Sequence, residues 1–336
     1  MNRISVIITT RNPRLSCLRR VVEALQAQTL PAKDWDLFVV DNASDLPFIH
    51  ELNLEWHPHA KYVREVNIGL VRARLCGIAN TTAELLVFVE DDSVLNAHYL
   101  ARALEIDHRY PMLGVWGGQL VPEYEVAPSE AVRPYLQLLG IRQFTKDIWG
   151  NNPNWGQIPI GAGICVRRAV ALRYYQDVLN DPLRQSLSHV GDRVSCHGDT
   201  DLAVTSFDVG LGIGLFQSLE LKHLIPKRKL NEKYLLQVLE NSAAALVVFQ
   251  TARNLQIETP PRGARWCLEQ LKYWASDPVQ RKISATRRRG LEIGRTIAAD
   301  LAKKRQENIN QSNQKPDMWT NASVLETIQH AAQLNP

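Results

Sequence analysis

The sequence predicts an α/β fold in which a mainly parallel sheet is flanked by helices and followed by a C-terminal helical region. Short apolar runs alternate with amphipathic helical patterns through the first 121 residues. This alternation is typical of stacked βαβ units, whose crossover helices make neighbouring strands parallel. The last hundred residues contain no strand pattern and are rich in Ala, Arg, Lys and Gln, which predicts helices there.

The elements of the first half follow in regular order. Apolar runs predict strands at residues 4–10, 35–41, 61–66, 84–89 and 113–121. Helical periodicity predicts helices at residues 15–28, 69–81 and 96–108.

The second half begins with an irregular stretch, residues 122–159, of a length that is usually functional or mobile. A strand and a helix are expected within 158–179, a loop entering a helix at 197–210, and a strand at 211–217. We therefore predict a domain at 1–230, divided into halves at 1–121 and 122–230, and a helical region at 231–336.

Composition narrows the class of protein. The net charge of +4, from 39 basic and 35 acidic residues, is too balanced for a general nucleic-acid binder. No signal peptide is visible, and no window reaches the ~18 apolar residues of a membrane span. We expect a cytoplasmic protein with reduced thiols, since no two cysteines have C-x-x-C spacing: Cys17, Cys76, Cys165, Cys196 and Cys267.

Polar side chains follow three of the predicted strands. The carboxyl ends of parallel strands form the edge where α/β sheets bind ligands, so a shared site is expected there. Each cluster alone would also fit ordinary turns and helix caps. The clusters are Thr9, Thr10, Arg11 and Asn12; Asp41, Asn42, Ser44 and Asp45; and Glu90, Asp91 and Asp92.

The third cluster ends the buried run "LLVFVEDD" with three carboxylates. Side chains alternate along a strand, so Glu90 and Asp92 would share one side and suit a hard divalent cation such as Mn²⁺ or Mg²⁺. The alternative is that Asp92 or Ser93 caps the following helix.

The motifs "ISVIITTRN", "VVDNAS", "NIGLVRARLCGI" and "LLVFVEDD" resemble, in order and spacing, those of the family 2 glycosyltransferases, which have the GT-A fold with a Rossmann-like nucleotide-binding sheet. The resemblance is clear over residues 4–92. It continues more loosely through "GAG" and "GDTDL" to about residue 230.

The resemblance implies a nucleotide-diphosphate sugar at the sheet edge, with UDP favoured because Asp41 matches the acid that accepts a hydrogen bond from the base. Arg74 would pair with a carboxylate or phosphate; the alternative is a solvated helix residue. The other implied donor-binding residues are Thr9, Thr10, Arg11, Asn67, Gly69, Glu90 and Asp91.

The resemblance also implies a metal site, in which Asp92 binds the ion and Glu90 contacts ribose or a metal-bound water. His223 matches the late metal-binding histidine of some GT-A enzymes, although a lone histidine is more often structural. In the basic run "PKRK", Arg228 is assigned to the diphosphate, together with Lys227 and Lys229; a solvated loop is the alternative.

By the same resemblance, Asp199 is the general base, and Asp201 and the small residues Gly161, Ala162 and Gly163 bind the acceptor. The alternatives are purely structural: the two aspartates would cap a helix N-terminus, and the two glycines would form a tight turn. The family's usual Glu is replaced here by Gly198.

The implied activity is an inverting, metal-dependent transfer of sugar to an acceptor hydroxyl of a glycan or lipid-linked molecule, in surface glycan or glycolipid synthesis. A sugar nucleotidyltransferase or a catalytically silent binding protein is the alternative. The nine basic residues in 281–305 suit peripheral contact with the inner face of a membrane, or else a solvated or oligomer-forming helix.

Overall fold

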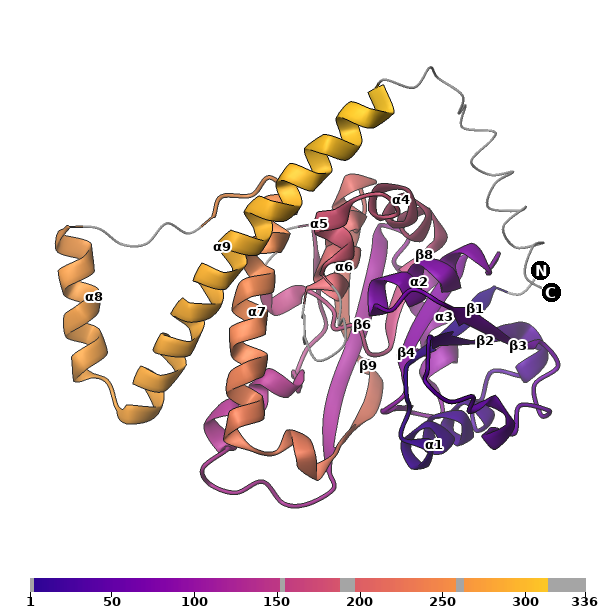
Figure 1. The fold of residues 1–336 in the computed structure, drawn as a ribbon. Helices are drawn as coiled ribbons and strands as arrows, with labels where there is room; N and C mark the ends of the chain where they lie inside the picture. Colours follow the sequence, from indigo (N-terminus) through magenta and orange to yellow (C-terminus); the bar gives the residue numbers. More distant parts are fainter. Residues whose placement is uncertain (1–2, 152–154, 188–196, 258–262, 314–336) are drawn as a thin grey trace.

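The computed structural model describes residues 3–151, 155–187, 197–257 and 263–313, so Cys196 and residues 314–336 lie outside the described chain. A nine-stranded sheet with the order β3-β2-β1-β4-β8-β6-β9-β5 runs through this part, and β7 pairs with β9 (Figure 1). The strands are β1 (Ile4–Thr10), β2 (Trp35–Asn42), β3 (Ala60–Glu65), β4 (Leu85–Glu90), β5 (Ser93–Leu95), β6 (Leu113–Tyr124), β7 (Ile148–Gly150), β8 (Ile164–Arg167) and β9 (Gly212–Ile225).

The α/β class is confirmed, but the sheet is mixed rather than mainly parallel. Strands β1, β2, β3 and β4 are parallel to one another, and β6 is parallel to β9. Strands β5, β7 and β8 are antiparallel to their neighbours. An irregular connection leads from β6 to β8, so no crossover helix forces β8 to be parallel. Because β8 lies between β4 and β6, the two predicted halves of the domain share one sheet.

Helices cover both faces of the sheet and form two buried layers. Along β1 the side chains alternate: Ile4, Val6 and Ile8 face α1 and α3, whereas Ile7 faces α2, α4 and α6. The helices are α1 (Leu15–Gln26), α2 (Leu70–Ala79), α3 (Tyr99–Arg109), α4 (Arg168–Val178), α5 (Pro182–Gln185) and α6 (Gly198–Asp208).

The segment after β4 excludes the capping alternative for the three carboxylates. Ser93 begins strand β5, and helix α3 starts only at Tyr99, with His98 at its N-cap. Strand β9 is also longer than predicted, because it continues through Lys222 to Ile225. Because Ser93 pairs with His223, the end of β9 lies beside Glu90, Asp91 and Asp92, which we call the acidic turn.

The C-terminal region forms α7 (Glu232–Ala252), α8 (Ala264–Ala275) and α9 (Pro278–Asn313), as the sequence predicts. Helix α9 packs closely along α7, where a Cβ at Gly290 would lie 2.2 Å from the carbonyl oxygen of Glu240. Helix α7 is long and apolar enough to cross a membrane by length and composition, contrary to the expectation from the sequence, but half of the relevant window is buried inside the protein.

Candidate active site

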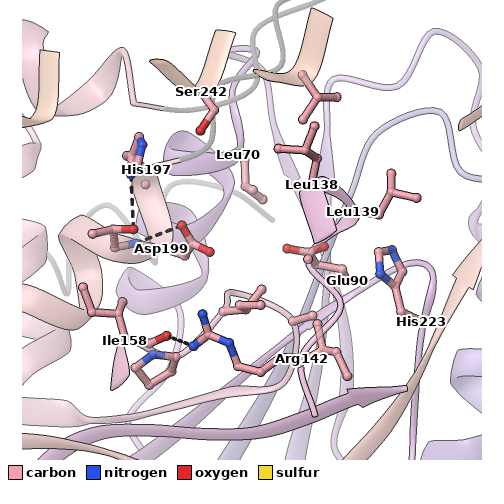
Figure 2. A pocket seen from close by; sticks show the side chains of 18 of the residues that line it. Leu70, Glu90, Leu138, Leu139, Arg142, Ile158, His197, Asp199, His223 and Ser242 are labelled. Carbon is pink, nitrogen blue, oxygen red and sulfur yellow. Dashed lines mark hydrogen bonds between the residues drawn. The ribbon is translucent and has the colours of Figure 1, made fainter. Parts of the chain in front are cut away.

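A cavity of about 410 Å³ opens where β4, α2, α6 and the end of β9 meet. Figure 2 shows the carboxylates of Glu90 and Asp199 facing this space, with Arg142 and His223 beside them. The ionisable residues that line it come from distant parts of the chain: Arg74, Glu90, Arg142, His197, Asp199, His223, Lys229 and Tyr234.

Asp199 lies in the first turn of α6, where the helix N-terminus stabilises negative charge. One carboxylate oxygen accepts a hydrogen bond from the backbone N–H of Gly161 at 2.9 Å. The other accepts one from the N–H of Thr200, also at 2.9 Å. Two backbone donors therefore hold the side chain at the cavity, a position that suits a base and also places its negative charge at the helix N-terminus.

Gly161 is required by the crowding around it. A Cβ at this position would lie 2.3 Å from Nη2 of Arg74, 3.2 Å from Cβ of Asp199 and 3.3 Å from Oε1 of Glu90. The missing side chain lets these three groups approach the same stretch of backbone.

Arg74 is not a solvated helix residue, because only 2% of its surface is exposed. Its Nη2 lies 3.8 Å from Oε1 of Glu90, and its buried Nε has no partner among the described residues. Burial, together with the charge of Asp92, raises the pKa of Glu90, and the charge of Arg74 opposes that rise. The guanidinium is therefore available to an anionic group that enters the cavity.

The predicted metal ligands Asp92 and His223 are neighbours in space. Nε2 of His223 lies 3.5 Å from Oδ2 of Asp92, and Nζ of Lys229 lies 3.1 Å from the same oxygen. Oδ1 of Asp92 and Nδ1 of His223 are buried with no hydrogen-bond partner in the described chain. An oxygen left without a donor beside an imidazole fits a cation with two protein ligands, although no group of three or more His, Cys, Asp or Glu suited to an ion occurs among the described residues.

The middle carboxylate of the turn has a separate partner, because the hydroxyl of Thr10 donates a hydrogen bond to Asp91. Burial and the charge of Asp92 raise the pKa of Asp91 to about 7. Thr9 pairs with Glu90 across β1 and β4. Arg11 makes a loose ion pair with Asp45, at 3.5 Å. These residues form the β1 side of the acidic turn.

Asp41 is buried and already satisfied. Its carboxylate accepts hydrogen bonds from the Ser44 N–H at 2.9 Å, from the Tyr62 hydroxyl at 2.7 Å and from Arg64 at 2.7 Å. Burial acts to raise its pKa, but the hydrogen bonds and the charge of Arg64 lower it overall. The half-exposed side chain of Arg64 thus lies against a fully buried carboxylate.

Asn42 organises the predicted Asn67–Gly69 segment, a role that the sequence did not reveal. Its amide donates to the carbonyl of Asn67 at 2.7 Å and accepts from the N–H of Gly69 at 2.6 Å. Gly69 has φ of 144° and precedes α2, where other residues are strained. The three residues thus shape the entry to the helix that carries Arg74.

The structure gives Asp201 a different place from the predicted acceptor site. Its carboxylate is completely buried and lies 2.8 Å from Nε of Arg184 and 2.6 Å from Nε of Arg253. Helical spacing directs Asp199 and Asp201 to different sides of α6. Asp201 therefore connects α6 to α5 and α7.

Two other predicted site residues, Gly163 and Arg228, do not line the cavity. Gly163 has φ of 73°, and a Cβ there would lie 2.5 Å from the Tyr99 hydroxyl. This glycine therefore allows close packing against Tyr99. Its neighbour Ala162 does line the cavity. Arg228 is exposed, and Lys229 is the residue of the basic run that lines the cavity. Arg142 was missed because it lies in the irregular segment, where no motif marks it.

The chain is similar to a known protein family and to a curated relative. The family described as "Glycosyl transferase family 2" matches residues 5–172, half of the chain. A curated relative, "N-acetylgalactosaminyltransferase 6" of Drosophila melanogaster, is 36% identical over 107 residues, which are 30% of this chain and 16% of that protein. The match thus spans about a sixth of the relative's length.

Two solved structures are also similar. The crystal structure of S. aureus TarS 1-349 has a TM-score of 0.48 at 13% identity and covers 93% of this chain and 92% of its own. A second crystal structure of S. aureus TarS has a TM-score of 0.46 at 16% identity, covering 77% of this chain and 41% of its own.

Proposed function

This chain belongs to the family 2 glycosyltransferases, and from that membership we propose that it transfers a sugar from a UDP-sugar to an acceptor hydroxyl with inversion. The observation that carries the proposal is that Asp199 and Glu90, more than one hundred residues apart, face one cavity. A single displacement at the anomeric carbon requires a base for the acceptor hydroxyl beside the bound donor, and these two carboxylates line one cavity that could hold both.

In this mechanism Asp199 takes the proton of the acceptor hydroxyl. The N–H groups of Gly161 and Thr200 hold its carboxylate, so that little reorganisation is needed as the oxygen attacks. Arg74 and Lys229 line the same cavity, where their positive charges suit the diphosphate that leaves. Asp41 supports uridine as the base, once Arg64 has moved.

Asp92 and His223 would hold a divalent ion, either Mn²⁺ or Mg²⁺, as the unpartnered oxygen of Asp92 suggests. When bound, such an ion supplies positive charge for the departing diphosphate. The acceptor we infer is a glycan or a lipid-linked molecule in surface glycan or glycolipid synthesis.

The replacement of the family's usual Glu by Gly198 does not argue for a silent protein. A Cβ at Gly198 would lie 2.6 Å from the carbonyl oxygen of Leu187 and 3.2 Å from Val71. The backbone here packs too closely for any side chain, and the neighbouring Asp199 keeps its place at the cavity.

The activity is tested by incubating the protein with a panel of nucleotide sugars and Mn²⁺ or Mg²⁺ and measuring the release of nucleoside diphosphate. We expect slow, metal-dependent hydrolysis of one donor without acceptor. Asp199→Asn should bind the donor normally and lose transfer, whereas Asp300→Asn, an exposed change on α9, should behave as wild type. The proposal would be wrong if no donor in the panel released nucleoside diphosphate and none bound in a metal-dependent way.

We also propose that the enzyme contacts an anionic membrane surface through α8 rather than through the basic helix α9. The inward face of α9 is buried against α7, where Gly290, Gly294 and Ala298 pack. Helix α8 projects from the molecule (Figure 1) and exposes Leu268, Leu271 and Trp274 on one side, each between 58% and 69% exposed.

The charge near this apolar stripe favours lipid as its partner. Residues 264–305 contain eleven Arg or Lys and four Asp or Glu. Arg288 of α9 lies over the ring of Tyr273 on α8, at 5.0 Å. A basic surface beside Leu and Trp side chains suits anionic headgroups above an acyl boundary, which would place the enzyme at the cytoplasmic face of a membrane.

Co-sedimentation with phosphatidylglycerol vesicles tests this contact, with phosphatidylcholine vesicles as the neutral comparison. We expect binding to the anionic vesicles only, and Trp274→Ser should weaken it about tenfold. Leu46→Ser, at an exposed leucine of the sheet domain, should bind as wild type. Equal binding by Trp274→Ser and wild type, or a dimer that buries the stripe, would count against the membrane.

A further inference from the structure

The acidic turn already contains a cation of the protein's own. The ammonium group of Lys229 donates a 3.1 Å hydrogen bond to Oδ2 of Asp92, the carboxylate that the proposed function assigns to the divalent ion. The two side chains are largely buried, at 19% and 18% exposure. Lys229 follows β9 in a short 3₁₀ helix, so its side chain enters the cavity from the side of His223.

The charges around the pair make this lysine necessary when nothing else is bound. Glu90, Asp91 and Asp92 are consecutive and part-buried, and buried carboxylates are costly unless they are paired. A lysine side chain is a cation at neutral pH, and the 3.1 Å hydrogen bond to Asp92 holds this ammonium group beside the carboxylates. Lys229 and His223 both lie against Oδ2 of Asp92.

Oδ1 of Asp92 has no partner in the described chain, but Lys229 lies against Oδ2 of the same carboxylate. A divalent ion at Oδ1 and the ammonium group at Oδ2 would repel each other strongly where water is largely excluded. An ion at Asp92 therefore favours the departure of Lys229, and a diphosphate in the cavity offers the displaced ammonium a new anionic partner.

We propose that Lys229 is an internal competitor of the divalent ion for Asp92, and that the diphosphate of the donor releases it. The proposal rests on the metal site of the proposed function and adds an order to it: the ion alone binds weakly, and the ion and the nucleotide strengthen each other's binding. Such mutual strengthening is a reciprocal coupling of the two binding free energies.

The test measures Mn²⁺ binding without nucleotide, by calorimetry and by the loss of the free Mn²⁺ spin-resonance signal. Lys229→Met should bind Mn²⁺ about tenfold more tightly than wild type, since its competitor is gone. Lys229→Arg keeps the charge and should resemble wild type. Lys227→Met removes an exposed neighbouring charge and serves as the matched control.

A second titration with saturating UDP tests the release. UDP should tighten Mn²⁺ binding to wild type by about tenfold and tighten it much less in Lys229→Met. Mn²⁺ affinity that is equal or lower in a folded Lys229→Met, with thermal unfolding as the check, would overturn the inference. Failure of every variant to bind Mn²⁺ and UDP would instead overturn the metal site and the proposed function together.

Discussion

The backbone N–H of Gly161 donates a 2.9 Å hydrogen bond to the carboxylate of Asp199. The bond joins the turn before β8 to the start of α6, so two separate segments position one candidate base. The same glycine leaves room for Arg74, whose Nη2 would lie 2.3 Å from a Cβ placed there. The residue at position 161 therefore affects the positions of both the Asp199 carboxylate and the Arg74 guanidinium.

Gly161→Ala should impair catalysis more than stability. The clash is with the flexible end of Arg74, which can move, so the melting temperature should change little. Displacing the guanidinium by about 1 Å should lower kcat/KM by roughly one hundredfold. Gly150→Ala is the matched control, because its Cβ would meet only Gln157 at an ordinary 3.8 Å. Full activity in Gly161→Ala would show that the geometry at this glycine is unimportant.

Asp201→Asn should destabilise the fold rather than alter substrate binding. The change leaves the guanidinium groups of Arg184 and Arg253 without their shared buried carboxylate. Breaking a buried ion pair costs about 3–5 kcal/mol, measurable by urea unfolding. Arg253 also pairs with Asp208, which is more exposed than Asp201. Asp208→Asn should therefore cost less free energy of unfolding than Asp201→Asn. KM values that change with no loss of stability would favour the acceptor-binding role instead.

His57 should make stability depend on pH. Burial, aided by the charge of His59, lowers its pKa from 6.5 to about 4. Between these two pKa values the unfolded chain binds more protons than the folded chain. The contribution of His57 to the free energy of unfolding is therefore fully present above about pH 6.5 and is lost as the pH falls toward 4. Between pH 8 and pH 5 this residue should account for about 2 kcal/mol.

His57→Phe keeps an aromatic ring against Trp35, whose ring centre lies 4.2 Å away, and removes the titrating group. Urea unfolding at several pH values should show a shallower loss of stability toward acid in this variant than in wild type. His108→Gln, at an exposed histidine on α3, is the control. Parallel pH profiles for wild type and His57→Phe would rule out His57 as the source.

Arg64→Ala should increase the affinity for UDP. Arg64 occupies an oxygen of Asp41 that a uracil N–H would need, at 2.7 Å, and its side chain is 44% exposed. Removing this competitor should tighten UDP binding by about fivefold, the equivalent of one net hydrogen bond, in calorimetric titrations. ADP, which lacks the matching N–H, should bind equally to both proteins. Weaker UDP binding in Arg64→Ala would argue that the arginine itself holds the nucleotide.

Local pattern predicted the first half of the fold well. Strand β1 has the predicted bounds, and no bound of β2, β3 or β4 differs from its prediction by more than one residue. Apolar runs and helical periodicity are properties of neighbouring residues, so they can be read from the sequence. The short strands β5 and β7 were missed, since three residues carry no period. The pairing of β8 between β4 and β6 depends on contacts remote in sequence, which no local pattern encodes.

By itself, the sequence determined the α/β class, the family resemblance and the presence of carboxylates at the ends of the strands. Only the tertiary structure decided which charges face the cavity. Asp199 and Asp201 are two residues apart on one helix, yet one lines the cavity and the other is buried between Arg184 and Arg253. Likewise, Lys229 rather than Arg228 reaches Asp92. The environment of a charge is set by the segments that pack around it, so adjacent residues with the same chemistry acquire different roles.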